Sequence, residues 1–254
     1  MRIIGGEFRR RRLKSPPERS STRPLPDNVR EAIFNLLRGH FEGVGVLDCF
    51  AGTGSFGLEA ISRGAERVVM VERDRRVAAV LEDNMETLGV EDRGEVVMSD
   101  ALGAAALSRC PRPAHIIFMD PPYEMVRDPE HWPRVRTQML RLIQMLTPDG
   151  YAMLRTPWPF VHAVDPQTDE PLTHEEAKRR FDAARSEFLD EAFEGAEETG
   201  KRRPEPQRKY VEIDLALEGA LGPETHAYGT TAIHLYMRDP EAGAAETEGA
   251  ADRA

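Results

Sequence analysis

Hydrophobic residues along the chain form two patterns that alternate. Short apolar runs with the length of a buried strand occupy positions 44–50, 67–72, 95–100, 114–120 and 150–156. Between these runs, apolar residues recur every three or four positions, as on the buried face of a helix. The stretch from Asp74 to Gly89 is the clearest helix, because a capping acid opens it and a glycine closes it. Strands that alternate with helices predict a parallel sheet covered on both faces.

The C-terminal part of the chain departs from this rhythm. The segments 209–217 and 230–237 alternate apolar and polar residues, and they predict an antiparallel hairpin at the sheet edge. The stretch 157–208 reads as an insertion. In it, Thr173 and Glu176 form a capping box for a helix that runs to about residue 198.

These patterns predict three parts in the chain. Residues 1–40 form a basic arm and a helix that Asp27 or Asn28 caps. Residues 41–238 form the main domain, which includes the insertion, and its size suits one well-filled core. Residues 239–254 are rich in Ala, Glu and Gly, so we expect them to be disordered.

Charge is distributed unevenly along the chain. The net charge is −10, but residues 1–40 contain ten Lys or Arg against four Asp or Glu, a net of +6 that leaves −16 for the rest. Such a basic segment on an acidic body favours contact with nucleic acid phosphates, and a merely solvated arm is the alternative. For Arg23 and Arg30, a structural role in helix capping or ion pairing is an equally open alternative to nucleic-acid contact. The candidate nucleic-acid contacts are Arg9, Arg10, Arg11, Arg12, Arg23 and Arg30.

The sequence carries no sign of export or membrane insertion. The apolar runs have strand length, and the basic N-terminus lacks the apolar core of a secretion signal. The two cysteines, Cys49 and Cys110, have no spacing typical of a disulfide framework or a metal site. We therefore expect a cytoplasmic protein that needs no metal.

Acidic residues stand at the ends of four predicted strands. They are Asp48, Glu72, Asp100 and Asp120. In an open parallel sheet, ligands bind beyond the carboxyl ends of the strands. One acid at a strand end is ordinary, but four predict that this edge of the sheet holds the functional site.

A glycine-rich turn follows the first strand, in the sequence DCFAGTGSFGLEA. Gly52, Gly54 and Gly57 have the spacing of a dinucleotide fingerprint, which is a weak signal alone. Asp48 stands just before the turn, where it would repel a pyrophosphate and attract an amino group. Glu72 stands where a carboxylate accepts hydrogen bonds from both hydroxyls of a ribose. The turn therefore predicts a ligand that is a nucleoside carrying a cation.

S-adenosylmethionine has this chemistry, with Asp100 and the Ala101 amide placed near its adenine. The candidate cofactor-binding residues are Asp48, Phe50, Ala51, Gly52, Gly54, Glu72, Arg73, Asp100, Ala101 and Asp120.

The fourth strand ends in the sequence DPPY, Asp120 to Tyr123. Prolines cannot donate to a sheet ladder, so the strand must stop at Asp120 and a stiff loop follows. Taken alone, these four residues fit a simple turn as well as a site that holds a carboxylate beside an aromatic ring.

The order VLDCFAGTG, VERD, SDA and DPPY resembles class I S-adenosylmethionine-dependent amino-group methyltransferases. With RIIGGEFRRRRLKSP, RPLPDNVREAIFNLL, GLEAISRGA and HAYGTTAIHLY, the chain resembles the bacterial 16S ribosomal RNA guanine-N2 methyltransferase family of the RsmD type. The resemblance covers roughly residues 1–156 and 209–238. Leu25 and Asn28 depart from the family pattern at positions that could touch RNA. The insertion 157–208 is also absent from that pattern.

The resemblance implies a Rossmann-like α/β fold with a mostly parallel seven-stranded sheet, helices on both faces and a C-terminal antiparallel hairpin. It also implies a monomeric enzyme that methylates 16S rRNA, free or in an assembling 30S subunit. In such an enzyme the Asp120 side chain and the Pro121 carbonyl accept the hydrogens of a base amino group. Pro122 stiffens the loop, and Tyr123 stacks on the base.

Several functions remain open at this point. The two acceptors suit guanine N2, adenine N6 and cytosine N4 equally, so the choice of guanine rests on the resemblance. A DNA adenine-N6 methyltransferase and an inactive RNA-binding protein of the same fold are the main alternatives. A nicotinamide dehydrogenase is disfavoured, because Asp48 opposes a pyrophosphate and DPPY has no role in hydride transfer.

Overall fold

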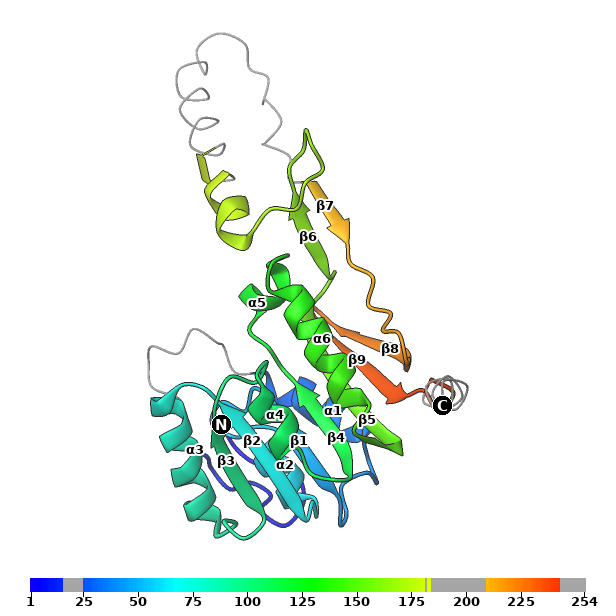
Figure 1. The fold of residues 1–254 in the computed structure, drawn as a ribbon. Helices are drawn as coiled ribbons and strands as arrows, with labels where there is room; N and C mark the ends of the chain where they lie inside the picture. Colours follow the sequence, from blue (N-terminus) through cyan, green and yellow to red (C-terminus); the bar gives the residue numbers. More distant parts are fainter. Residues whose placement is uncertain (16–24, 181, 184–208, 243–254) are drawn as a thin grey trace.

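The computed structural model describes residues 1–15, 25–180, 182–183 and 209–242, and its centre is a seven-stranded sheet (Figure 1). The strand order is β3-β2-β1-β4-β5-β9-β8. The first five strands are parallel, β9 is antiparallel to β5, and β8 is antiparallel to β9. The predicted mostly parallel sheet with a C-terminal hairpin is therefore confirmed. The strands are β1 Gly45–Asp48, β2 Arg67–Glu72, β3 Gly94–Met98, β4 Ala114–Met119, β5 Leu146–Pro157, β8 Ala220–Tyr228 and β9 Thr231–Arg238.

Helices cover both faces of the sheet, and the alternation of side chains along each strand feeds two cores. In β4, Phe118 belongs to one buried cluster, and its neighbours Ile117 and Met119 belong to the other. The first cluster includes side chains of α1, α2 and α3, whereas the second includes side chains of α4, α5 and α6. The helices are α1 Asp27–Leu36, α2 Gly57–Ser62, α3 Arg75–Leu88, α4 Ala104–Arg109, α5 Tyr123–Arg127 and α6 Trp132–Ile143.

The helix ends show where local sequence rules hold. Asp74 caps α3 as predicted, accepting hydrogen bonds from the amides of Arg76 and Val77, and Gly89 ends the helix with φ of 69°. The predicted cap of α1 is wrong, because Pro26 occupies that position and Asp27 lies in the first turn. The carboxylate of Asp27 forms ion pairs with arginines instead.

The N-terminal segment is fixed to the body of the protein. Ile3 and Leu13 are buried in the core, and the amides of Ile4 and Gly5 donate to the carboxylate of Glu59 at 2.6 and 2.8 Å. Glu59 itself is fully buried on α2. The segment therefore presents its four consecutive arginines from a fixed turn; Arg9, Arg10, Arg11 and Arg12 are all exposed.

The C-terminal pairing differs from the prediction in one respect. The segment 209–217 does not pair with β9; its first part, β7 Lys209–Glu212, pairs with β6 Val161–Val164 in a separate two-stranded sheet. The hairpin partner of β9 is β8, a segment that was not predicted as a strand. Alternation marks a strand but does not identify its partner. The β6–β7 sheet projects beyond the end of β5 (Figure 1).

The capping box predicted within the stretch 157–208 is confirmed. The Thr173 amide and hydroxyl donate to Glu176, and the Glu176 amide donates to the Thr173 hydroxyl, so the capping box is present. Within the described residues, the chain is helical at 174–180 and 182–183. The rest of the predicted helix and the tail lie largely in 184–208 and 243–254, outside the described residues.

Candidate active site

The register of the sheet gathers three predicted acids at one edge. Asp48 ends β1, where it is level with Met70 on β2 and Phe118 on β4. Glu72, the last residue of β2, and Asp120, the residue just after β4, follow those partners by two positions, so they lie on either side of the end of β1. Asp48 is close enough to both to interact electrostatically. Parallel strands therefore bring together residues that are far apart in the sequence.

The glycine turn lies against this cluster. Gly52 and Gly54 have φ of 55° and 92°, a conformation that other residues rarely adopt. The Gly52 amide donates to Glu72 at 3.0 Å, and the Asp74 amide donates to the second oxygen of Glu72 at 2.8 Å. A Cβ atom at Gly52 would meet no atom of the described residues within 4 Å. The turn thus leaves open space beside the Glu72 carboxylate.

Asp48 is the most buried of the acids, with no exposed surface. Its Oδ2 accepts from the Gly57 amide at 2.9 Å, and its Oδ1 has no hydrogen-bond partner among the described residues. Burial raises the pKa of Asp48 to about 8, against the opposing effect of the Gly57 amide. A buried acceptor without a partner is costly, and a donor group on a ligand would satisfy it.

Asp100 lies two residues after the end of β3, and it makes contacts separate from those of the other acids. Its Oδ1 accepts from the Leu102 amide at 2.9 Å, and its Oδ2 lies 3.3 Å from Arg134 on α6. Ala101 is buried, with its carbonyl bonded to Gln138 at 2.9 Å. Of the other predicted cofactor-binding residues, Phe50 is half-buried, Ala51 is buried and Arg73 is exposed.

The DPPY sequence follows β4 directly and contains all four predicted catalytic residues. The Asp120 side chain is 14% exposed, and its Oδ1 forms an ion pair with Nε of Arg155 on β5. Pro121 is buried, and Pro122 stands at the cap position of α5. Burial raises the pKa of Asp120, and the pair with Arg155 opposes this rise.

The Tyr123 ring is also held in place. Its hydroxyl donates to Oγ1 of Thr231, the first residue of β9. The Cζ atoms of Arg155 and Arg127 lie 4.7 and 5.6 Å from the ring centre. Sequence reasoning missed Arg155 and Thr231. The only available signal was an arginine near the end of the predicted strand 150–156.

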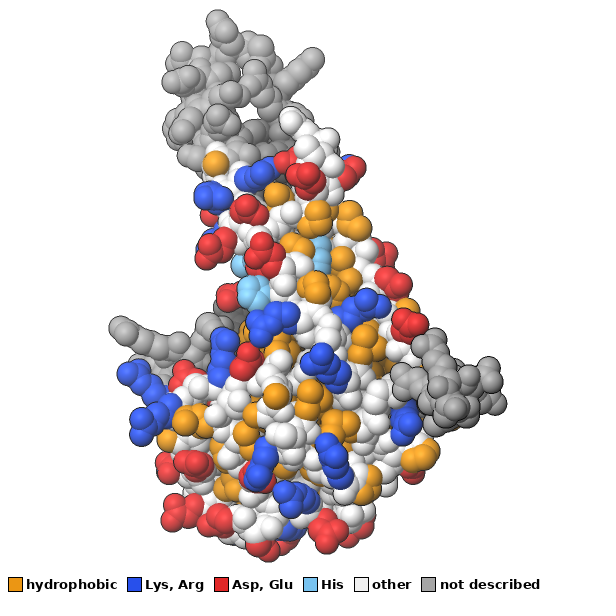
Figure 2. All heavy atoms as spheres, in the orientation of Figure 1, with side chains coloured by type: hydrophobic (Ala, Val, Ile, Leu, Met, Phe, Trp, Pro, Cys, Tyr) orange, Lys and Arg blue, Asp and Glu red, His pale blue; other side chains and the backbone are white. Residues whose placement is uncertain are grey.

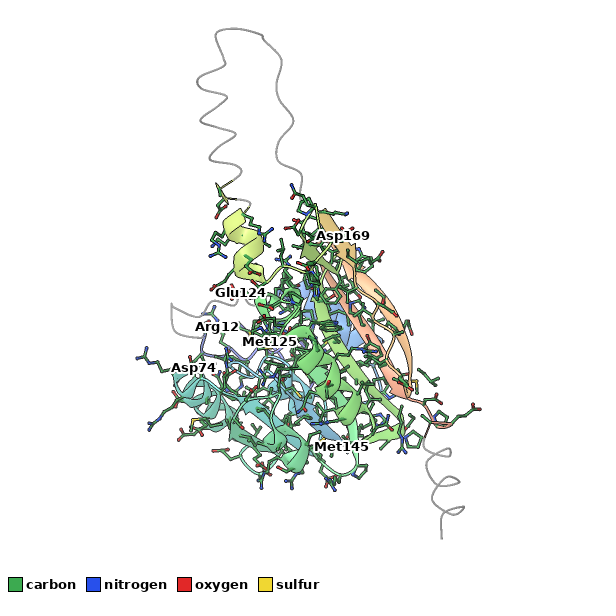
Figure 3. The ribbon with its side chains drawn as sticks, turned by 45° about the horizontal axis from the view of Figure 1, so that its top comes forward. Arg12, Asp74, Glu124, Met125, Met145 and Asp169 are labelled. Carbon is green, nitrogen blue, oxygen red and sulfur yellow. The ribbon has the colours of Figure 1, made fainter. Side chains whose placement is uncertain are left out.

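The predicted RNA contacts have different surroundings. Arg12 lies on the same side of the molecule as Asp74 and Glu124, which follow the ends of β2 and β4, whereas Met145 lies at the far side (Figure 3). The Asn84 amide group bridges the carbonyls of Lys14 and Thr53, so the basic segment ends beside the glycine turn.

Two of the predicted RNA contacts do not join the four exposed arginines. Arg30 is 1% exposed and bonds to the Arg2 carbonyl at 2.6 Å and to Asp27 at 3.0 Å. Its burial leaves no surface for RNA, so it has the structural role that the sequence left open. Arg23 lies within 16–24, outside the described residues.

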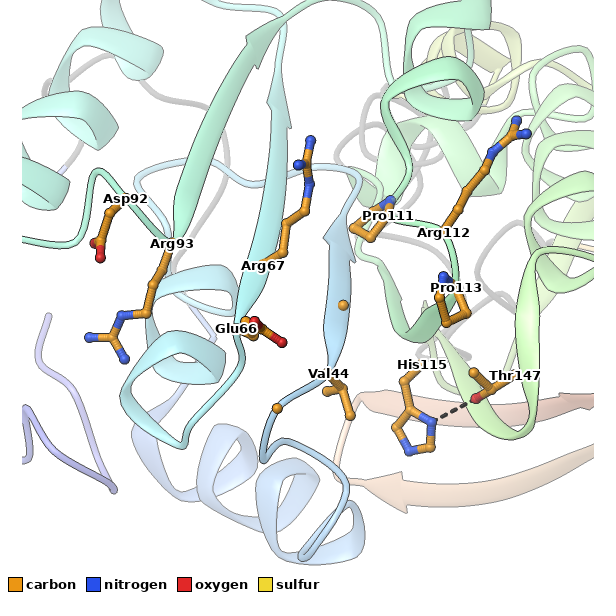
Figure 4. Close-up of a pocket in the computed structure, with 12 residues that line it drawn as sticks. Val44, Glu66, Arg67, Asp92, Arg93, Pro111, Arg112, Pro113, His115 and Thr147 are labelled. Carbon is orange, nitrogen blue, oxygen red and sulfur yellow. Dashed lines mark hydrogen bonds between the residues drawn. The ribbon is translucent and has the colours of Figure 1, made fainter.

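A hollow of about 630 Å³ opens at the opposite edge of the sheet, where the strands begin (Figure 4). Arg67, Arg93 and Arg112 line it, but their side chains point away from one another. Because ligands of parallel sheets bind at the carboxyl ends of the strands, this hollow is not the expected site. Within the described residues, no group of three or more His, Cys, Asp or Glu is placed to hold a metal ion.

Residues 1–168 match the family model described as Conserved hypothetical protein 95. The chain belongs to this family. A stretch of 152 residues is 36% identical to the "Putative rRNA methyltransferase YlbH" of Bacillus subtilis, and it covers 59% of this chain and 79% of that protein. A stretch of 123 residues is 42% identical to the Ribosomal RNA small subunit methyltransferase D of Escherichia coli K12, and it covers 48% of this chain and 60% of that protein. The resemblance drawn from the sequence is confirmed.

Solved structures show the same fold. A structure described as "Putative methyltransferase yhhF" from Escherichia coli superposes with a TM-score of 0.57 at 24% identity, over 94% of this chain and 98% of that one. A hypothetical protein of Thermus thermophilus superposes with a TM-score of 0.56 at 24% identity, over 94% of this chain and 99% of that one. Among the described residues, no helix has both the length and the apolar character needed to cross a membrane.

Proposed function

We propose that this chain transfers a methyl group from S-adenosylmethionine to the exocyclic N2 amino group of a guanine in 16S rRNA. One observation carries the proposal. The register of the sheet places the Asp120 carboxylate of DPPY beside Asp48, which accepts a hydrogen bond from the Gly57 amide at the end of the glycine turn. Glu72 accepts from the Gly52 amide of the same turn and interacts electrostatically with Asp48. An acceptor for an amino group and a site for a nucleoside cofactor therefore share one edge. The rRNA methyltransferase relatives support RNA as the substrate.

The geometry suits activation of an amino group. A base amino nitrogen is a poor nucleophile, because its lone pair is delocalised into the ring. Arg155 engages Oδ1 of Asp120, and Oδ2 has no partner among the described residues, so Oδ2 is available for one amino hydrogen. The Pro121 carbonyl, held by the stiff loop, accepts the other. Two such contacts favour a pyramidal nitrogen, and they act by positioning and charge stabilisation.

The residues present fit the cofactor. S-adenosylmethionine supplies an electrophilic methyl group when bound. Glu72 has carboxylate oxygens beside the open space over Gly52, where ribose hydroxyls could donate to it. The unpartnered Oδ1 of Asp48 is the acceptor that an ammonium group would satisfy. Asp100 and the following Ala101 are the candidates for adenine contact at the end of β3.

The N-terminal segment is the candidate surface for RNA. Lys and Arg are mixed with Asp and Glu over the face seen in Figure 2, so this face offers no single-sign surface for a phosphate backbone. The consecutive arginines at 9–12 are exposed on a segment that Glu59 and Asn84 fix beside the glycine turn. A fixed row of cations grips a phosphate backbone with little loss of chain entropy. We expect the enzyme to act as a cytoplasmic monomer on 16S rRNA or on an assembling 30S subunit.

Methyl transfer from labelled S-adenosylmethionine tests the proposal. Three acceptors are compared: 30S subunits from cells that lack the protein, naked 16S rRNA, and duplex DNA. We expect label in the subunits, in the naked RNA, or in both, and none in DNA. Label confined to DNA would favour the adenine-N6 alternative, and cofactor binding without transfer to any acceptor would favour an inactive RNA-binding protein.

A further inference from the structure

Arg155 connects the two functional side chains of the DPPY sequence. Its guanidinium pairs with Asp120 and lies 4.7 Å from the centre of the Tyr123 ring. The side chains of Arg155 and Asp120 are only 12% and 14% exposed. Because charges this deeply buried persist only when they are paired, the contact is a built feature of the site and not a surface ion pair.

The fold dictates this contact. Met119 on β4 is level with Leu154 on β5, so the residues that follow them, Asp120 and Arg155, stand side by side. On its other side, Arg155 is level with Ile233 on β9. The strands therefore fix the backbone of Arg155, and only its side chain is free to move.

Burial opposes the negative charge of Asp120, and the groups near it on the other elements include acids and a phenol. Asp48 on β1 interacts with Asp120 electrostatically, and Glu72 on β2 adds a further acid beside Asp48. On α5, the titratable group that belongs to the same DPPY sequence as Asp120 is the Tyr123 phenol. Among the described residues, Arg155 is the one cation that contacts Asp120. Burial raises the pKa of Asp120, and the pair with Arg155 lowers it.

We propose that Arg155 is a positioning residue for the methyl transfer, holding Asp120 as a carboxylate and fixing the Tyr123 ring beside it. This inference rests on the proposed function, because it assigns Asp120 the task of accepting an amino hydrogen. A protonated Asp120 would present a donor where an acceptor is needed. By binding only Oδ1, Arg155 keeps the group ionised and leaves Oδ2 for the base.

The ionisation of Asp120 is measured directly by carboxyl ¹³C NMR, without RNA or cofactor, with the signal assigned by its loss in Asp120→Asn. We expect a higher titration midpoint in Arg155→Met than in the wild type. Arg155→Lys keeps the charge and should stay close to the wild type. Arg127→Met is the matched control, because Arg127 lies by the same ring without contacting Asp120. An unchanged midpoint in Arg155→Met would overturn the inference.

The pH dependence of kcat/KM separates positioning from a merely structural role. In Arg155→Met the acid limb should move to higher pH, and below that limb each pH unit of displacement lowers the rate about tenfold. The limb should stay in place in Arg155→Lys and Arg127→Met. An equal loss at every pH would contradict the inference. If Arg155→Met does not fold, Arg155→Gln carries the same expectations.

The proposed function and the positioning role of Arg155 can be refuted separately. A wild type that methylates no RNA refutes the proposed function. In that case the NMR titration still decides whether Arg155 controls the ionisation of Asp120. An active wild type whose acid limb is unmoved by Arg155→Met refutes the inference alone.

Discussion

The ionisable groups at the two ends of the parallel strands differ in their burial and in their contacts. At the carboxyl ends, Asp48 and Asp120 are buried with raised pKa values and are held by a backbone amide and by Arg155. At the amino ends there is a hollow of about 630 Å³, but its arginines point apart and Asp149 nearby is exposed. Open space alone therefore does not mark a site. A cluster of buried polar groups indicates a functional site better than open space does. Burying such groups destabilises the fold, so their presence together points to selection for a function.

Replacing Asp120 by Asn should have the largest effect. The Asn amide presents a donor to the base amino group, so we expect a loss of about 10²–10³ in the rate of methyl transfer. Cofactor affinity by calorimetry should stay close to the wild-type value. Asn is preferred to Ala, because Ala would remove every polar atom that faces the Arg155 guanidinium at position 120.

The matched control lies at the other end of the strands. Asp149→Asn changes an exposed acid, so its rate and cofactor affinity should equal those of the wild type. If Asp120→Asn lost cofactor binding and turnover equally, the acceptor role of Asp120 would be wrong.

Asp48 should make stability fall as pH rises. Its pKa is about 8 in the folded protein against an ordinary value of 3.8, so the folded state holds an extra proton between these limits. The free energy of unfolding should therefore decline from about pH 4 to pH 8, by an amount on the order of several kcal/mol. Urea titrations at pH 5 and pH 8 measure this. Asp48→Asn should remove most of the decline, and an equal decline in that variant would show that another group causes it.

Neutralising the exposed arginines tests the RNA surface. With Arg9 to Arg12 changed to Gln, we expect weaker rRNA binding and a salt slope that falls by roughly 0.7–0.9 for each phosphate that is no longer neutralised. Arg67→Gln with Arg112→Gln is the control, since these cations line the hollow at the opposite edge. An unchanged salt slope in the variant with Arg9 to Arg12 replaced would show that these arginines are solvated and do not contact RNA.

The amino ends should show the smallest effect, with the opposite sign. His115 bonds to His40 at 2.9 Å and to Thr147 at 2.7 Å, and burial lowers the pKa of His115. The folded state therefore holds fewer protons here than the unfolded chain near pH 6. Stability from this group is present above about pH 6.5 and falls as the pH drops below it. His115→Asn should flatten that acid slope in urea titrations between pH 5 and pH 7, and a slope that stays would assign it elsewhere.

The sequence was sufficient for the parts of the fold that depend on local chemistry. The Asp74 cap, the Gly89 stop and the apolar runs of the five parallel strands needed only neighbouring residues to be recognised. The gathering of Asp48, Glu72 and Asp120 also followed, because parallel strands place their carboxyl ends together.

Other features depended on contacts between distant segments. The pairing of Asp120 with Arg155 requires the register between β4 and β5, which no local pattern contains. The burial of Arg30 depends on the path of residues 1–13, and the true partner of β9 depends on where the β6–β7 sheet leaves the main sheet. Polar periodicity could not distinguish β7 from β8, since both are largely exposed.

The most direct test of the central claim is mass-spectrometric mapping of the methyl group in 16S rRNA. Ribosomal RNA from cells that lack the protein is compared before and after treatment with the purified enzyme and S-adenosylmethionine, with Asp120→Asn as the impaired control and equal, short reaction times. We predict that one guanine gains a single methyl group on N2 with the wild type, and that Asp120→Asn installs about 10²–10³ times less of it in the same time. A methyl group on adenine or cytosine, on a ring atom, or one that Asp120→Asn installs equally well, would contradict it.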